Sequence, residues 1–178
     1  MILGGHEIET IGEEILFPFN KKLLNAASYN FKLGNIILEC ANDAITHHYI
    51  DTKNLIETQK FIKHELTDER GLLMMPGKLY LGNTLERLNL PNNICAQAEG
   101  RSSVGRIGMQ VHLTAGWLDP GFKGYVTLEI SVLHPVWVYP NMEIGQFIFK
   151  PCGPNDGYKG HYQEQPGEPV LSRGNFYR

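Results

Sequence analysis

The sequence predicts a mainly β protein with a few short helices, in a single domain over residues 1–178. Apolar and polar residues alternate over several stretches with a period of two, which is typical of half-buried strands. Turn signals separate these stretches, and the 19 glycines and 10 prolines favour short strands over a helical bundle. A chain of 178 residues can bury a sizeable core without disulfides.

The first half of the chain is expected to hold two strands and a charged excursion. Lys21–Ala27 is expected to form a short helix after a mixed N-terminal segment. Tyr29–Gly34 alternates like a strand that ends at a turn, and Asn35–Cys40 is expected to continue as the next strand. Asp43–Arg70 is polar and charged without sustained periodicity. It is therefore expected to be a long excursion with short irregular elements.

The second half carries stronger strand signals. Lys78–Leu90 alternates as a half-buried pair of strands would, and Pro91–Asn93 marks a turn. The alternating run Gly124–Leu133 predicts a further strand, and two shorter strands are expected at Pro135–Tyr139 and Ile144–Lys150. From Gly153 onward the chain has few aliphatic residues and cannot form its own core. Two interpretations stay open: a frayed terminus, or a segment that orders over a bound ligand through Arg173 and Arg178.

Composition excludes several classes of function. No apolar run approaches the ~18 residues that span a bilayer, and no basic segment precedes an apolar one at the N-terminus, so a cytoplasmic protein without a membrane partner is expected. The three cysteines, Cys40, Cys95 and Cys152, are widely spaced and read as free thiols. The net charge of −3 comes without any Lys/Arg block, so no nucleic-acid polymer is expected as a partner. A small anionic ligand remains compatible, because a few arginines or a divalent metal neutralise phosphates locally.

The segment Ala98–Met109 is the most informative stretch. Gly100 lets the backbone turn, two serines follow Arg101, and Arg106 comes five residues after it. Main-chain N–H groups, hydroxyls and guanidinium groups can converge on phosphate oxygens in such a segment. The alternative is a surface turn that carries two arginines.

Two carboxylates are candidates for a site. The turn Asp119–Gly121 follows from its own residue types, and Asp119 is either structural or placed to accept a hydrogen bond from a sugar hydroxyl. Alternation puts Glu129 on one strand face with Tyr125 and Thr127. Glu129 is either solvated on an outer face or lies in a cleft, where it can take and return a proton.

Other catalytic motifs are missing from the sequence. Zinc-dependent nucleobase deaminases carry His-x-Glu and later Pro-Cys-x-x-Cys. None of the seven histidines has Glu two residues later, and the second cysteine is missing after Pro151-Cys152. The sequence also lacks a Gly-x-x-x-x-Gly-Lys-Ser/Thr loop, a Gly-x-Ser-x-Gly elbow and a His-Glu-x-x-His helix. A resident zinc ion is therefore not expected.

Five motifs follow one another along the chain: Glu99–Gly108, Thr114–Gly124, Thr127–Glu129, Ile144–Gln146 and Tyr162–Gln165. Their order resembles that of the dCTP deaminase family in the trimeric dUTPase-like superfamily, and Ala27–Gly34 is a weaker match to its N-terminal signature. The resemblance implies a distorted β-barrel of the dUTPase-like type. It also implies a homotrimer with active sites at subunit interfaces.

The resemblance implies hydrolytic deamination of dCTP to dUTP and ammonia without zinc, within pyrimidine deoxynucleotide biosynthesis. Glu129 would deprotonate a water that attacks C4 of the cytosine and pass the proton on as ammonia leaves. Ser102, Arg106 and the backbone carbonyl of Ala115 would hold the water and stabilise the tetrahedral intermediate.

The resemblance also implies the contacts with the rest of the nucleotide. The phosphates would bind Arg101, Ser102 and Ser103. The 3′-hydroxyl of the deoxyribose would bind Asp119, and the edge of the base would bind Thr127. Mg²⁺ would be carried on the triphosphate and not in a protein cage. Tyr158 and Gln165 would contact the triphosphate beneath a closing tail, residues 153–178. The full substrate-binding set is Arg101, Ser102, Ser103, Val104, Gly105, Arg106, Asp119, Thr127, Leu128, Glu129, Tyr158, His161 and Gln165.

Three residues depart from the family pattern: His161 replaces a lysine, Asn30 replaces an aspartate and Val132 replaces an asparagine. An alternative activity is the bifunctional one, in which the triphosphate is also hydrolysed to dUMP and pyrophosphate. Val104-Gly105-Arg106 looks more like these bifunctional members. A plain dUTPase would leave Glu129 without a role, and a catalytically idle binding protein would not need Arg106 together with Glu129.

Overall fold

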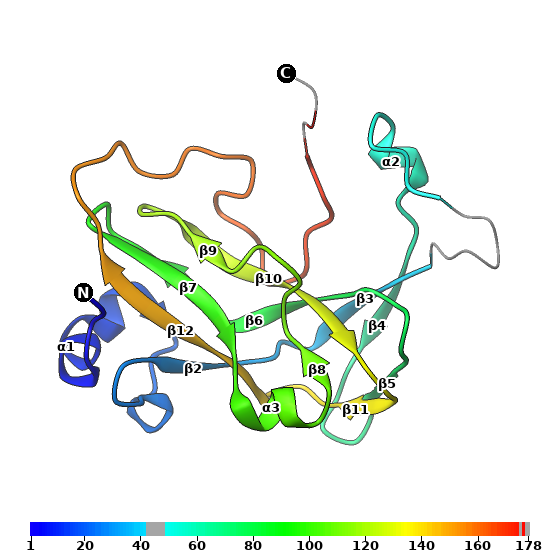
Figure 1. Ribbon diagram of the computed structural model, residues 1–178, viewed down its shortest axis with the longest axis horizontal. Coiled ribbons are helices and arrows are strands. Elements are labelled where there is room, and N and C mark those ends of the chain that lie inside the picture. The colour runs from blue at the N-terminus through cyan, green and yellow to red at the C-terminus, as the bar shows by residue number, and fades with distance from the viewer. Residues whose placement is uncertain (42–48, 175, 177–178) are drawn as a thin grey trace.

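The structure is a computed structural model that describes residues 1–41, 49–174 and 176 (Figure 1). The predicted mainly β fold with a few short helices is confirmed. The helices are α1 (Gly5–Ile15), the 3₁₀ helix η1 (Lys21–Leu23), α2 (Leu55–Thr58) and α3 (Ser102–Arg106). The strands are β1 (Leu16–Phe17), β2 (Tyr29–Lys32), β3 (Ile36–Cys40), β4 (Phe61–Glu65), β5 (Leu72–Met74), β6 (Tyr80–Asn89), β7 (Ile94–Gly100), β8 (Met109–Gln110), β9 (Trp117–Leu118), β10 (Lys123–Val132), β11 (Val136–Val138) and β12 (Glu143–Pro151).

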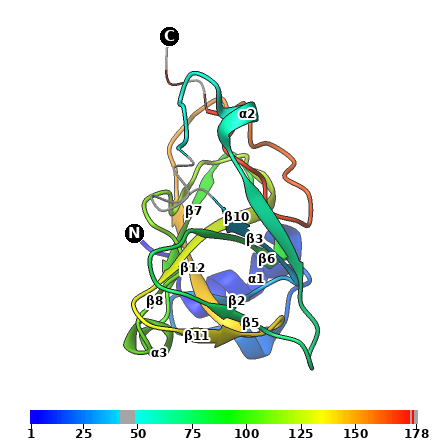
Figure 2. The same ribbon diagram turned by 90° about the vertical axis from the view of Figure 1, so that its right-hand side faces the viewer.

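The described strands form three antiparallel sheets that do not close into a single barrel. The largest has the order β4-β3-β6-β10-β8, and β1 also pairs with β6. A second sheet has the order β2-β12-β7-β9, and β5 pairs with β11 in the third. Helix α3 and the C-terminal tail lie at opposite ends of the molecule in both views (Figures 1 and 2).

The core lies between the two larger sheets and confirms the predicted alternation of β10. Val126, Leu128 and Ile130 are at most 5% exposed, whereas the residues between them are half-buried. From the other sheet, the rings of Phe31 and Phe147 meet with their centroids 4.5 Å apart. Burying one such ring contributes about 1.5–3 kcal/mol to folding, so this alternation sets which face of β10 remains free for a ligand.

The expected pair of strands over Lys78–Leu90 is wrong, because this segment forms the single strand β6. β6 makes a bulge opposite β10: Arg87 pairs with Tyr125, but the next pair is Asn83 with Thr127. The bulge turns polar side chains inward, where their hydrogen-bonding groups find partners. The hydroxyl of Thr84 donates to the carbonyl of Glu86 at 2.8 Å and accepts the Val126 N–H at 3.0 Å.

The N-terminal segments also differ from expectation. The helix expected over Lys21–Ala27 is the shorter η1, and α1 was not expected at all. Ile8 and Ile15 of α1 are buried, and Glu7 accepts the Gly4 N–H at 2.8 Å to cap its first turn. The charged excursion contains α2 and β4, and residues 42–48 of it lie outside the described residues.

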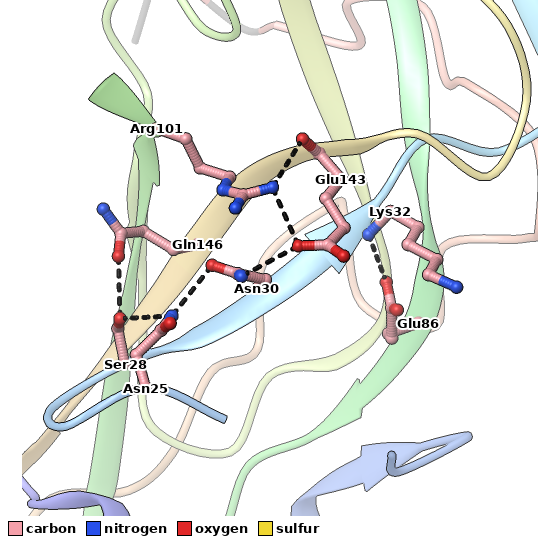
Figure 3. A network of polar contacts seen from close by, with 8 residues as sticks. All are labelled: Asn25, Ser28, Asn30, Lys32, Glu86, Arg101, Glu143 and Gln146. Atoms are coloured by element: carbon pink, nitrogen blue, oxygen red, sulfur yellow. Dashed lines mark hydrogen bonds and ion pairs between the residues drawn. The ribbon is translucent and has the colours of Figure 1, made fainter. Parts of the chain in front are cut away.

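A buried carboxyl joins the two larger sheets. Glu86 on β6 is 1% exposed, and its side chain accepts the backbone N–H of Lys32 on β2 at 2.9 Å (Figure 3). Burial raises the pKa of Glu86 to about 7, because removal from water disfavours the charged carboxylate. The folded protein therefore holds the proton of Glu86 more tightly than the unfolded chain does.

Glu86→Gln is expected to change how stability depends on pH. The extra stability from protonated Glu86 is fully present below the unfolded pKa near 4.5 and is lost as pH rises to about 7. Relative to the variant, the wild-type free energy of unfolding should therefore fall by about 3 kcal/mol between these pH values. Urea unfolding across this range measures the difference, with the exposed Glu13→Gln as control. A pH-independent difference for Glu86→Gln would contradict the prediction.

Candidate active site

A cleft of about 630 Å³ lies between the free face of β10, the loop before it, the excursion and the C-terminal tail. Its walls are mostly apolar, with a few polar groups that converge, which is typical of a small-molecule site. The cleft brings together six of the residues predicted for the site: Ala115, Asp119, Thr127, Glu129, Tyr158 and Gln165.

Glu129 faces this cleft from β10 and is half-buried. Its carboxylate accepts the backbone N–H of Thr114 at 3.4 Å. Ala115 is the next residue of that loop, so the predicted proton carrier and the predicted carbonyl acceptor line the same part of the cleft. A strand supplies the rigid mounting that proton transfer requires.

Thr127 connects β10 to the C-terminal tail. Its hydroxyl donates to Gln165 Oε1 at 2.7 Å and accepts the Val170 N–H at 3.1 Å. The backbone of Gln165 also accepts the Tyr125 N–H at 3.2 Å, alongside an isolated parallel bridge to Gly124. Of the two interpretations of the tail, the described part fits a docked segment and not a frayed terminus.

Asp119 begins the predicted turn, in which its carbonyl accepts the Phe122 N–H at 3.2 Å. Its carboxylate accepts the indole N–H of Trp117 at 3.1 Å. Tyr158 packs edge-on against Phe122, with ring centroids 5.9 Å apart, and donates its backbone N–H to Pro120 at 2.7 Å. The turn therefore holds Asp119 and Tyr158 at the same end of the cleft.

The predicted phosphate-binding segment lies elsewhere in the same chain. None of residues 101–106 lines the cleft, and α3 lies at the opposite end of the molecule from the tail (Figures 1 and 2). Ser102, Ser103, Gly105 and Arg106 are exposed on α3. One copy of the chain therefore does not bring Arg106 to Glu129.

Three other predicted residues, Val104, Leu128 and His161, are not among the residues that line the cleft. The side chains of Val104 and Leu128 are in the core, at 4% and 0% exposure, so they can contact a ligand only through their backbone. His161 is exposed in the tail, where its carbonyl accepts the Arg173 guanidinium at 3.2 Å.

A polar network joins three of the segments that carry the family resemblance (Figure 3). Arg101 forms an ion pair with Glu143 at 2.8 Å, and Asn30 Nδ2 donates to the same carboxylate at 2.9 Å. Gln146 accepts the Ser28 hydroxyl at 2.7 Å and donates to the Gly100 carbonyl at 3.0 Å. The network holds the backbone just before α3. Sequence reasoning missed Glu143 because its partners are distant along the chain.

The described residues contain no group of three His, Cys, Asp or Glu side chains arranged to hold a metal ion. Cys40, Cys95 and Cys152 are free thiols, as expected. No helix in the described part of the chain is long and apolar enough to cross a membrane.

Comparisons with known proteins agree with this architecture. A solved structure, the 2′-deoxycytidine 5′-triphosphate deaminase from Agrobacterium tumefaciens, superposes with a TM-score of 0.65 at 22% identity and covers 83% of this chain. The chain spans 47% of the length of that protein, and the likeness defines the fold class. The model of the dCTP deaminase-like family matches residues 2–152. The chain belongs to this dCTP deaminase-like family.

Curated relatives cover nearly the whole chain. A "dCTP deaminase, dUMP-forming" from Clostridium botulinum (strain Alaska E43 / Type E3) is 44% identical over 99% of both chains. A protein of the same name from Leptospira biflexa serovar Patoc is 42% identical over 99% of this chain and 98% of its own. The match therefore includes the tail that lines the cleft.

Asn30→Asp is expected to destabilise the protein, although the resemblance to the family's N-terminal signature implies an aspartate at this position. Asn30 is 7% exposed and donates to Glu143, so an aspartate would remove this donor and place a second carboxylate beside the first. The loss should be about 1–3 kcal/mol at pH 7.

Urea unfolding at pH 7 measures this loss, with Asn93→Asp as control because Asn93 is exposed. Wild-type stability of Asn30→Asp at pH 7 would show that Arg101 alone neutralises both carboxylates.

Proposed function

We propose that this protein is a bifunctional dCTP deaminase that forms dUMP. In the first reaction dCTP and water give dUTP and ammonia, and in the second dUTP and another water give dUMP and pyrophosphate. The observation that carries this proposal is the full-length similarity to relatives named as dUMP-forming, at 40–44% identity. It favours the bifunctional alternative over dUTP as the final product.

In the deamination step, Glu129 transfers protons. Its carboxylate takes a proton from a water in the cleft, and the oxygen of that water forms a bond to C4 of the cytosine. As this bond forms, the C4–N3 double-bond electrons move to N3, which takes the proton from Glu129. Glu129 then carries the remaining hydroxyl proton to the exocyclic amine, the bond between C4 and that amine breaks, and ammonia leaves as the C4 carbonyl forms. We assign the acceptance of a hydrogen bond from this water to the carbonyl of Ala115, and the support is that Ala115 and Glu129 both line the cleft.

Charge supports a site that two copies of the chain share. The described residues lining the cleft include Asp119 and Glu129 but no lysine or arginine, although a triphosphate requires cations nearby. Arg106 is exposed on α3, beyond reach of the cleft in its own copy. A homotrimer in which α3 of one copy reaches the cleft of the next would add Ser102, Ser103 and Arg106 to Glu129.

Magnesium fits this site as a companion of the nucleotide. Mg²⁺ keeps several waters and commonly binds through one or two carboxylates together with substrate phosphates. The described chain offers Asp119 at the cleft and no cage of three acidic or histidine ligands. When bound, the ion would neutralise the phosphates during the second hydrolysis, and the tail would cover the triphosphate through Tyr158 and Gln165.

Incubation with dCTP and Mg²⁺ is expected to yield ammonia, dUMP and pyrophosphate in equal amounts, with little free dUTP. Anion-exchange chromatography resolves the nucleotides, and coupled assays quantify ammonia and pyrophosphate. Accumulation of dUTP as the end product would identify a monofunctional deaminase. If no uracil nucleotide forms, both deaminase functions are wrong.

Mixing two inactive variants tests the shared site. Glu129→Gln and Arg106→Ala should each lower deamination by about 10²-fold or more, while the first still binds dCTP and folds. When the two are unfolded together and refolded at equal amounts, random assembly should give roughly a quarter of wild-type activity. This follows because one site in four receives both intact residues. A mixture no more active than its parents would mean that each site is built within one copy.

A further inference from the structure

The side-chain amide of Gln59 joins the excursion to the C-terminal tail. Gln59 Oε1 accepts the backbone N–H of Ser172 at 3.2 Å, and Gln59 Nε2 donates to the carbonyl of the same residue at 3.1 Å. The amide thus binds both polar groups of one tail residue, as a neighbouring strand would. Both residues line the cleft, so this contact lies where the tail borders the ligand space.

The backbone of Gln59 is held in place by the end of α2. Gln59 is the C-cap residue, and its N–H donates to the Leu55 carbonyl at 2.9 Å. Its Nε2 also approaches that carbonyl at 3.4 Å, so the side chain is oriented by its own helix. β4 continues the excursion and pairs with β3 of the large sheet, which ties this wall of the cleft to the fold.

The side of the tail that faces β10 is held by Thr127 and not by Gln59. Val170 and Gln165 both bond to the hydroxyl of Thr127, which is the group proposed to meet the base of the nucleotide. A bound nucleotide therefore competes for this contact. Among the described residues, the amide of Gln59 bonds the tail backbone and its own helix and does not bond Thr127, so a ligand on Thr127 leaves these bonds unchanged.

A second link between the excursion and the tail is an ion pair between charged side chains. Lys63 of β4 pairs with Glu168 at 2.8 Å, but both side chains are about half exposed, at 47% and 50%. Exposed ion pairs of this kind contribute little and are screened by salt. The two hydrogen bonds of Gln59 to Ser172 are also exposed, but they join neutral groups, so salt does not screen them and they can hold the tail while the cleft is occupied.

We propose that Gln59 is a positioning residue that keeps the tail closed between the two reactions. This inference rests on the proposed function: if deamination and triphosphate hydrolysis use one cleft, newly formed dUTP must stay bound until the second water attacks. Its escape depends on how often the tail opens. The excursion, to which the sequence assigned no role, then serves as the wall on which the tail closes.

Gln59→Leu tests the proposal because leucine retains most of the volume but neither hydrogen bond. The ratio of free dUTP to dUMP formed from dCTP should rise roughly tenfold. The rate of ammonia formation in a single turnover should remain close to wild type, since Gln59 does not touch the reacting atoms. In the ligand-free protein, hydrogen exchange of the Ser172 amide should also accelerate roughly tenfold.

Two further variants make the test specific. Glu57→Gln, on the same helix, is the matched control, because Glu57 is exposed and contacts Asn54 at 2.7 Å and not the tail. Gln59→Glu keeps the acceptor for the Ser172 N–H but sets a carboxylate oxygen against the Ser172 carbonyl. It should therefore leak dUTP as Gln59→Leu does, and it serves in place of that variant if leucine prevents folding.

An unchanged ratio of dUTP to dUMP in both Gln59 variants, from a wild type that makes dUMP, would overturn the role of Gln59 alone. Unchanged exchange at Ser172 would do the same, because it would show that the amide does not hold the tail. A wild type that releases all of its product as dUTP would instead refute the proposed function, and with it the retention role.

Discussion

The site depends on the register of β10. Val126, Leu128 and Ile130 bury their side chains in the core, so Thr127 and Glu129 must face the cleft. A slip of one residue would bury the carboxylate of Glu129 and expose three aliphatic side chains, at a cost of several kcal/mol. The same hydrophobic burial that folds the largest sheet therefore places the residue proposed to carry the proton.

The neighbouring strand fixes this register through polar groups. The β6 bulge lets the Thr84 hydroxyl accept the Val126 N–H, and it turns Glu86 toward the Lys32 amide of the other sheet. Both contacts are buried, so an unpaired group would carry its full desolvation penalty. A slipped pairing would leave these groups without partners. The bulge thus connects the pairing of β6 with β10 to the packing of the two larger sheets.

Local patterns in the sequence account for much of the fold and part of the site. The alternation of Gly124–Leu133 and the turn at Asp119 were predictable because their signals lie within a few residues. The bulge in β6 was not, because Thr84 and Glu86 are satisfied by distant strands. Likewise, the family motifs identify Glu129 and the tail, but Gln59 bonds a residue 113 positions away and no local pattern marks it.

The distribution of charge is the reason for proposing a site that one folded chain does not complete. The cleft supplies carboxylates and an apolar wall, which suit proton transfer and a base, while Arg106 stays exposed on α3. If the proposed homotrimer forms, separating Glu129 from Arg106 within one copy would keep Glu129 free of a permanent ion pair until chains assemble. Arg101 is already neutralised by Glu143, so its role in the ligand-free chain is to hold the start of α3. In the proposed homotrimer, assembly would place cations where the phosphates bind, and closure of the tail would exclude water from the charges that remain.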